Sequence, residues 1–408
     1  MNSTERLEHL DILRGAAIFG ILLVNMMYYA HPYIYYQIVG DIPWDSTLDR
    51  ITGYAIYFFG EGKFISMFAM LFGIGVVIQM DRAKTKGAKF FPVYFRRLTV
   101  LLIIGAVHAF LIWMGDILLA YALMGFIILF FFRNRKPKTL IVWTVISLLI
   151  PFIIFGLMTL AVSSLDTDSV DSTESIEESI PSELQWFNDL IERSIEAYGT
   201  GNVNDILVMR VIDISLYFIF GIFWMPAAFA LMLFGIAIAK RNIAQQIDNH
   251  QSLLNKILLW GFILGIAGNA IALTGFIKSD PVESNYWELA MYLGRAIGAP
   301  SLMLFYAAGI TQLYRYGWFP RFFIRLAAVG RMALTNYILQ SIICTMLFYS
   351  YGLGLYGSVG PFAGLLITVA IFIIQLFISP LWMKRFHFGP LEWLWRSGTY
   401  MKIQRFSK

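Results

Sequence analysis

The amino-acid sequence predicts an all-α, polytopic integral membrane protein with about ten transmembrane helices. Hydrophobic residues make up 58% of the 408 residues, and charged residues make up only 14%. The mean hydropathy of +0.67 lies far above that of soluble proteins. Apolar runs of about 20 residues, the length that a helix needs to cross the hydrocarbon core, recur along the chain.

The ten predicted spans follow one another from the N-terminus, and short loops join most of them. Their approximate ranges are 12–30, 53–79, 96–113, 116–132, 139–163, 207–239, 254–276, 289–313, 329–350 and 361–383. The sixth is longer than a bilayer requires and contains Pro226, so we expect it to be kinked or to lie partly along the interface. The chain divides into an N-terminal transmembrane bundle with the candidate site (1–163), an acidic extracytoplasmic loop with an interfacial helix (164–206) and a C-terminal transmembrane bundle (207–408).

Basic residues are concentrated in the loops that follow the even-numbered spans, whereas the opposite loops are acidic or neutral. DRAKTKGAK follows the second span and RNRKPK follows the fourth. Because cytoplasmic loops carry an excess of lysine and arginine, we expect both termini in the cytoplasm and the protein in the cell membrane. The first apolar run lacks a clear cleavage site, which favours a retained signal anchor.

The acidic loop contains two different patterns. Residues 166–181 are rich in serine, aspartate and glutamate, whereas residues 183–198 have helical periodicity. We expect a solvated linker followed by a helix on the membrane surface, with a lid over an outward-facing cavity as the alternative.

The sequence lacks the residues that several classes of function need. Cys344 is the only cysteine, which rules out an intramolecular disulfide and a cysteine-based metal site, and no other metal cluster is evident. No basic stretch is interleaved with aromatic residues, so we expect no nucleic-acid partner. Nucleotide-binding, HExxH and nucleophile-elbow motifs are absent as well.

Two segments resemble each other weakly, FAMLFGIGVVIQMDR (68–82) and FALMLFGIAIAKR (229–241). Both run towards the predicted cytoplasmic side, so a repeat that they belong to would be parallel rather than inverted. The few shared letters are also compatible with chance.

The hairpin 95–138 is the best place to look for chemistry. Its two apolar runs meet at a hinge around Gly115, with His108 in the first run and Asp116 just past the hinge. An ionisable side chain at membrane depth is costly and usually faces a protein interior or a wet cavity. We select His108 and Asp116 as catalytic candidates; their contact depends on the turn of the hinge. A histidine satisfied between helices is the alternative for His108.

Two spans share one spacing of polar residues. Asp11, Arg14 and Asn25 lie on one face of the first span, and Asn25 is about 16 Å deeper than Arg14. Arg97 and His108 in the third span are also eleven residues apart. We expect these two spans to line a tunnel. The alternatives are an Asp11–Arg14 pair in the headgroup region and an amide hydrogen bond from Asn25 to a neighbouring helix.

Further polar residues lie near the ends of other spans. Those in the predicted outer halves are Glu61, Lys63, Arg210, Asp213, Asn269 and Arg295. A cavity open to both sides would explain this distribution better than scattered pairs. His31 is expected to be exposed at the membrane interface, Asn336 and Gln340 share a helix face, and Glu392 is expected to pair with Arg396.

Ordered blocks along the chain resemble the YeiB-like family of bacterial membrane proteins. They are LDILRG with VN, KFISMFAMLFGIG, RRL with GAVHAFLIWMGDILLAYALMG, GRMALTNYILQS and GPLEWLWR. These blocks extend from Asp11 to Arg396, and the acidic loop is the variable part. The resemblance implies a membrane protein whose C-terminal half is a domain of unknown function.

The first block is also similar to the heparan-α-glucosaminide N-acetyltransferase group of transmembrane acyltransferases. Asp11, Arg14, Gly15 and Asn25 match the D-x-x-R-G…V-N motif of that group. The resemblance implies that acyl-CoA enters from the cytoplasm and that the acyl group passes to an acceptor on the far side. The essential histidine of the group lies in an H-A-x-W-x-G setting, which His31 lacks, so its role is not carried over.

These observations favour a transmembrane acyltransferase that uses acyl-CoA, with acetyl-CoA as the first candidate, and no metal. His108 would act as general base, Asp116 would orient it, and Asn25 would donate to the thioester oxyanion. Guanidinium groups suit phosphate oxygens. The candidate cofactor-binding residues are Asp11, Arg14, Arg96, Arg97 and Arg331.

The expected partners are membrane lipids and a small-molecule, lipid-linked or glycan acceptor, and a homodimer is compatible with the sequence. The rival interpretation is a transporter of small solutes or lipids that uses the buried polar residues as a substrate or proton pathway. Discontinuous helices in corresponding positions of two halves would favour the transporter.

Overall fold

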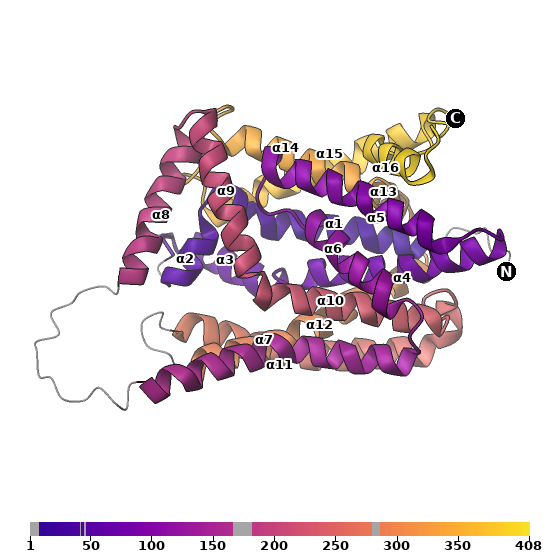
Figure 1. Cartoon of the computed structure of the whole chain (residues 1–408), viewed down its shortest axis with the longest axis horizontal. Helices are drawn as coiled ribbons and strands as arrows, with labels where there is room; N and C mark the ends of the chain where they lie inside the picture. Colours follow the sequence, from indigo (N-terminus) through magenta and orange to yellow (C-terminus); the bar gives the residue numbers. More distant parts are fainter. Residues whose placement is uncertain (1–7, 41, 45, 166–181, 280–285) are drawn as a thin grey trace, which may run out of the picture.

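The structure is a computed structural model that describes residues 8–40, 42–44, 46–165, 182–279 and 286–408, and these residues form a bundle of helices (Figure 1). The helices of the first part are α1 (Glu8–Ala30), α2 (Tyr33–Val39), α3 (Thr47–Phe59), α4 (Lys63–Thr85), α5 (Phe90–Val107), η1 (His108–Ile112), α6 (Leu118–Ile127), η2 (Ile128–Phe132) and α7 (Pro137–Leu165). The helices of the second part are α8 (Ser182–Gly199), α9 (Val203–Ile219), α10 (Gly221–Lys240), η4 (Ile247–His250), α11 (Gln251–Lys278), α12 (Tyr286–Arg315), α13 (Pro320–Arg331), α14 (Ala333–Phe348), α15 (Pro361–Arg385) and α16 (Pro390–Tyr400).

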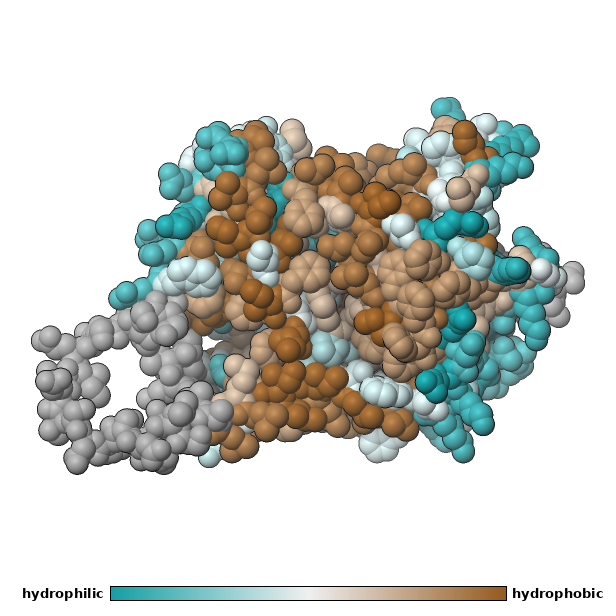
Figure 2. Space-filling view, in the orientation of Figure 1, coloured by the Kyte–Doolittle hydropathy of each residue, from teal (hydrophilic) through white to brown (hydrophobic). Residues whose placement is uncertain are grey.

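The predicted all-α membrane architecture is confirmed. Within the described ranges, eight helices are long and apolar enough to span a membrane, or nine if α13 and α14, bent by 82°, form one span. The predicted span 116–132 corresponds to the shorter apolar helix Leu118–Phe132, which accounts for the expected count of ten. A hydrophobic belt separates hydrophilic ends of the molecule in Figure 2, as a bilayer requires.

Both termini lie at one end of the bundle, which we call the basic end (Figure 1). Contacts between distant segments gather the helix ends there. His9 Nε2 is 3.0 Å from the Ala244 carbonyl oxygen, Lys240 donates to the Arg133 carbonyl, and Tyr314 donates to Glu8. Loops expected on one side of the membrane therefore do meet at one end of the structure.

Two of the expected spans are interrupted helices. The chain breaks between α3 and α4 at Gly60–Gly62, where Gly62 has a φ of +81° that a residue without a Cβ adopts readily. The overlong sixth span breaks into α9 and α10 at Phe220, whereas Pro226 lies inside α10. The interruption is thus six residues before the proline at which we expected a kink.

The two segments that echo each other pack against one another. A Cβ on Gly73 of α4 would lie 2.0 Å from the Met232 carbonyl oxygen, and one on Gly235 of α10 would lie 2.1 Å from the Met70 carbonyl oxygen. The equivalent glycines of FAMLFG and ALMLFG therefore make reciprocal contacts. Both positions hold glycine because the two backbones approach too closely for a larger residue, as at other membrane helix interfaces.

Helices from both sides of the acidic loop intermix. α1 packs along α13, and α10 packs against both α4 and α7. Part of the acidic segment, 166–181, lies outside the described residues. The helix expected next is present as α8, but it contacts α2 and α9 and buries Leu190 and Tyr198, so protein covers part of its surface.

Candidate functional site

His108 lies at the centre of a chain of buried hydrogen bonds. Its Nδ1 is 2.7 Å from Oδ2 of Asp116, and its Nε2 is 2.8 Å from Oγ of Ser341. The Ser341 hydroxyl is in turn 2.6 Å from the Tyr29 hydroxyl. The four side chains come from η1, the hinge before α6, α14 and α1, so residues far apart in sequence form one relay.

The local chain explains how Asp116 reaches His108. α5 ends in the π-helical turn η1, and residues 113–117 then reverse the chain without forming a helix. Asp116 Oδ1 accepts a hydrogen bond from the Leu119 backbone N–H in the first turn of α6 (2.6 Å). Its other oxygen, Oδ2, contacts the imidazole. Single π-turns often mark functional sites. The contact between His108 and Asp116, which the sequence left to the turn of the hinge, is present because the hinge interrupts the helix.

Ser341 and Tyr29 were not among the candidates from the sequence. Ser341 directly follows Gln340 in GRMALTNYILQS, and Tyr29 lies one turn after Asn25. A serine in an apolar run was the only available signal, and such a residue often bonds its own helix. Nothing in the sequence links it to a histidine 233 residues away.

Aromatic residues close the site. The ring centroids of Tyr29 and Trp113 are 3.9 Å apart, and those of His108 and Tyr337 are 5.1 Å apart. His108 and Ser341 are 0% exposed, and Asp116 is 2% exposed. Any substrate must therefore enter by a movement of the surrounding helices.

The expected tunnel between the first and third spans is replaced by a different arrangement. α1 packs against α13 and α14, whereas α5 packs against α6 and α16, and α14 contacts both α1 and η1. α14 thus connects α1 to the π-helical turn that follows α5. Asn25 is half-buried and makes no hydrogen bond to His108 or Ser341 among the described atoms, so Tyr29 is the residue through which α1 reaches the relay.

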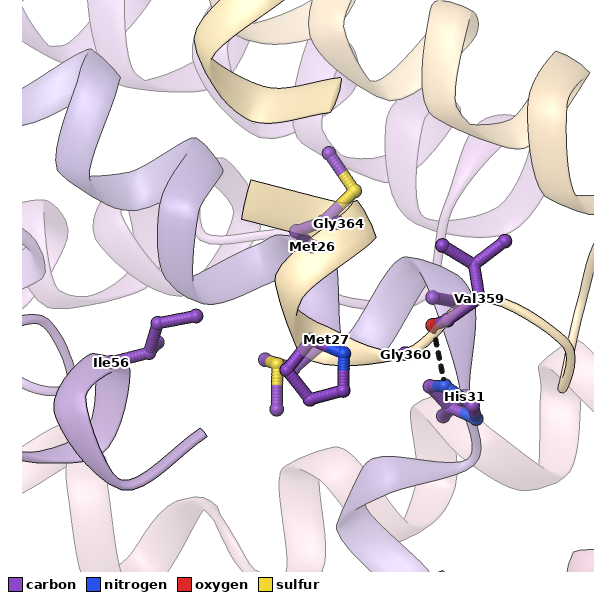
Figure 3. Close-up of a pocket in the computed structure, with 9 residues that line it drawn as sticks. Met26, Met27, His31, Ile56, Val359, Gly360 and Gly364 are labelled. Carbon is purple, nitrogen blue, oxygen red and sulfur yellow. Dashed lines mark hydrogen bonds between the residues drawn. The ribbon is translucent and has the colours of Figure 1, made fainter. Parts of the chain in front are cut away.

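A pocket lies at the C-terminal end of α1, the end that also carries Tyr29 (Figure 3). Met26, Met27, His31 and Pro361 contribute to its walls. The expectation that His31 is exposed was wrong, because it is 5% exposed and its Nε2 lies 2.8 Å from the Val359 carbonyl oxygen. Burial lowers the pKa of His31.

Several candidate cofactor residues gather at the basic end. Arg14 pairs with Asp11 at 2.8 Å, as the alternative interpretation expected, and its guanidinium also interacts electrostatically with that of Arg97. Arg97 lies 3.6 Å over the ring of Trp395. Gly330, the residue before Arg331, contacts the backbone of Asp11.

Two of these candidates have structural contacts of their own. Arg96 donates from Nε to the Thr399 carbonyl oxygen at 3.0 Å, which ties α5 to α16. The Nε of Arg331 is buried and has no hydrogen-bond partner among the described residues. An orphaned guanidinium nitrogen fits a site for phosphate oxygens, because each N–H can donate to one of them.

The polar residues of the opposite half form separate clusters rather than one cavity open to both sides. Glu61, at the α3–α4 break, pairs with Arg295 of α12, and buried Lys63 donates to the Tyr57 carbonyl oxygen at 3.1 Å. Asp213 of α9 accepts hydrogen bonds from Tyr35 and Tyr198. Each cluster satisfies part of its charge locally. Nowhere in the described ranges do three or more His, Cys, Asp or Glu side chains gather as metal ligands would.

Polar residues in the first half of α14 hold it in place. Asn336 donates to Ser379, and Gln340 donates to Gln375. The helix face that Asn336 and Gln340 were expected to share is therefore directed at α15. The expected Glu392–Arg396 pair was wrong. Glu392 instead accepts hydrogen bonds from the backbone N–H groups of residues 334 and 335 (2.7 and 3.1 Å), while Arg396 lies over aromatic rings.

The fold and the buried relay define a multi-pass helical membrane protein. Comparisons with known proteins identify the family to which it belongs. Residues 238–402 match a family described as a protein of unknown function, DUF418. The chain is 38% identical to the uncharacterized protein YxaH of Bacillus subtilis, over 100% of this chain and 97% of the relative. It is 30% identical to the uncharacterized protein YeiB of Escherichia coli, over 97% and 96% of the two chains. The chain therefore belongs to the YeiB/YxaH family of DUF418 proteins.

Proposed function

We propose that this protein is a transmembrane acyltransferase that moves an acyl group from acyl-CoA to an acceptor reached from the opposite end of the bundle. The observation that carries the proposal is the position of His108 between Asp116 and Ser341, at 2.7 and 2.8 Å. A neutral imidazole that a carboxylate orients can take a proton from an attacking hydroxyl or amine. Such general-base catalysis typically accelerates a reaction by about 10²–10⁴-fold.

The acyl-CoA phosphates would bind at the basic end, where Arg14 and Arg97 interact and Arg331 has an orphaned N–H. Bound phosphate oxygens would relieve the repulsion between the guanidinium groups. Arg97 and His108 are eleven residues apart, which is about 16 Å along a helix, so an extended pantetheine arm would connect the two regions. The acceptor would be a small-molecule, lipid-linked or glycan hydroxyl or amine.

Because the relay is enclosed, turnover requires α14 and its neighbours to separate from η1. The helix axis already changes direction by 82° between α13 and α14, and η1 ends in a non-helical hinge. Interruptions of this kind are places where a packed bundle can hinge.

The test is to incubate the purified protein with labelled acetyl-CoA and to measure binding and hydrolysis. We expect His108→Ala to lower turnover by about 10²–10⁴-fold with binding retained, and Arg97→Ala to weaken binding. The exposed residues His387 and Arg82 provide matched controls, and His387→Ala and Arg82→Ala should behave as wild type. Wild-type protein that binds no acyl-CoA would contradict the proposal.

Transport is the second candidate, and the interrupted helices favour it. α3–α4 and α9–α10 are both broken, and α4 and α10 carry the echoing segments, with Glu61 and Lys63 at the first break. Broken helices with charged groups in corresponding positions are typical of transporter sites. Proton flux in proteoliposomes that Lys63→Met abolishes, without any acyl-CoA binding, would favour this candidate.

A further inference from the structure

We infer that Ser341 carries the acyl group covalently between donor and acceptor, an inference that rests on the proposed acyltransferase function. Its Oγ is 2.8 Å from Nε2 of His108, whose Nδ1 is 2.7 Å from Asp116. A hydroxyl next to a base, with the base oriented by a carboxylate, is the arrangement that activates a serine nucleophile on unrelated folds.

The hydrogen-bond directions are consistent with an activated serine. With its proton on Nδ1, His108 donates to Asp116 and its Nε2 accepts from the Ser341 hydroxyl. Tyr29 then donates to Ser341 Oγ across 2.6 Å. Each of these protons has an acceptor in this order. The Ser341 hydroxyl also lies 3.3 Å from the Tyr337 carbonyl oxygen, but Nε2 of His108 is closer, at 2.8 Å. Since Ser341 is 0% exposed, an ester on it would also be shielded from hydrolysis until the acceptor arrives.

A buried N–H donor without an acceptor among the described residues belongs to a side chain beside the relay. Trp113 is 1% exposed, packs on Tyr29 and has a ring centroid 6.4 Å from that of His108. Its indole N–H is buried and has no acceptor within the part of the chain that the structure describes. A buried donor without a partner is costly, and a developing oxyanion would satisfy it.

Two balanced steps follow. In the first, His108 takes the Ser341 proton, Oγ bonds to the thioester carbonyl carbon, the C–S bond breaks, and the coenzyme A thiolate leaves with the proton from His108. In the second, His108 takes a proton from the acceptor hydroxyl or amine, which bonds to the carbonyl carbon. The bond between the carbonyl carbon and Ser341 Oγ then breaks, and Oγ recovers its proton from His108. No oxidant, reductant or metal is needed.

The experiment uses the full chain in nanodiscs with acetyl-CoA and no acceptor. We expect labelled coenzyme A to exchange into acetyl-CoA, and peptide mass spectrometry after acid quenching to find one acetyl group on Ser341. Ser341→Ala should reduce exchange to background, and Ser341→Cys should give a thioester that hydroxylamine removes. Ser379 is a buried serine of α15 bonded to Asn336, so Ser379→Ala is the matched control and should exchange as wild type.

The outcomes separate the two proposals. Acetyl-CoA hydrolysis by wild type without exchange, together with unchanged turnover in Ser341→Ala, would overturn the covalent step and leave the acyltransferase in place. Wild type that neither binds nor turns over acetyl-CoA would overturn both. If Ser341→Ala fails to fold, exchange and acetylation in the wild type, with the thioester in Ser341→Cys, still decide the question.

Discussion

At the scale of single residues, His108 and His31 show how partners set the chemistry of a histidine. Both are buried, at 0% and 5% exposure. His108 has a carboxylate on one nitrogen and a hydroxyl on the other, the partners that acid–base chemistry needs. His31 has the Val359 carbonyl on Nε2 and no partner for Nδ1 among the described residues. Only the first arrangement provides both an orienting group and a proton donor.

The pH dependence of stability should report on His31. Burial lowers its pKa and outweighs the opposing effects of the Val359 carbonyl and Asp49. The folded state therefore favours neutral imidazole, and the stability that it contributes is complete above the ordinary histidine pKa of about 6.5 and is lost as the pH falls below it. We expect the thermal midpoint of wild type to fall more steeply below about pH 6.5 than that of His31→Gln. Exposed His387→Gln should keep the wild-type slope, and parallel curves for wild type and His31→Gln would contradict the assignment.

At the scale of elements, close backbone approach decides which helices pair. Gly73 and Gly235 allow the backbones of α4 and α10 to touch where the two helices cross. Gly15 and Gly330 do the same for α1 and α13. Lipid tails are as apolar as leucine, so packing between membrane helices depends on such fits. These contacts hold together helices from both sides of the acidic loop.

Gly73→Ala should destabilise the protein, because its Cβ would lie 2.0 Å from a carbonyl oxygen of α10. Overpacking typically costs about 1–3 kcal/mol. Gly75, two residues later on α4, is the matched control, since a Cβ there meets nothing within 4 Å. Gly75→Ala should be neutral or stabilising by up to about 1 kcal/mol. Unfolding of both variants in detergent provides the measurement, and equal stability would contradict the close crossing.

At the scale of the whole molecule, both termini and the ends of several helices meet at the basic end, and a hydrophobic belt separates it from the opposite end (Figures 1 and 2). We predict from charge that the basic end faces the cytoplasm, because cytoplasmic loops carry an excess of lysine and arginine. The acyl-CoA proposal depends on this orientation, since its phosphate site is at the basic end.

Labelling of single cysteines in whole cells tests the orientation. Cys344 is buried and should not react, so it serves as an internal background. A membrane-impermeant maleimide should label Ser358→Cys, at the exposed turn before α15, in intact cells. Lys402→Cys, exposed after α16, should react only after the membrane is permeabilised. The reverse pattern would place the basic end outside.

The sequence by itself determined the class of protein and the approximate spans, and it singled out the 95–138 hairpin, where His108 and Asp116 do meet. Those features are local: a run of apolar residues needs no partner to favour the bilayer, and an ionisable residue within it is costly wherever the helix packs. Asp11 and Arg14, which the D-x-x-R-G…V-N motif selected, form the i,i+3 pair that the alternative interpretation expected.

Only the tertiary structure decided which side chains meet. The hinge at residues 113–117 turned Asp116 towards His108, α14 rather than α1 supplied the second partner, and Ser341 entered from 233 residues away. The same packing left Asn25 outside the relay and put Glu392 on the start of α14. Apolar periodicity shows how much of a helix is buried but not against which neighbour, because in a membrane almost every face is apolar and small steric fits select the partner.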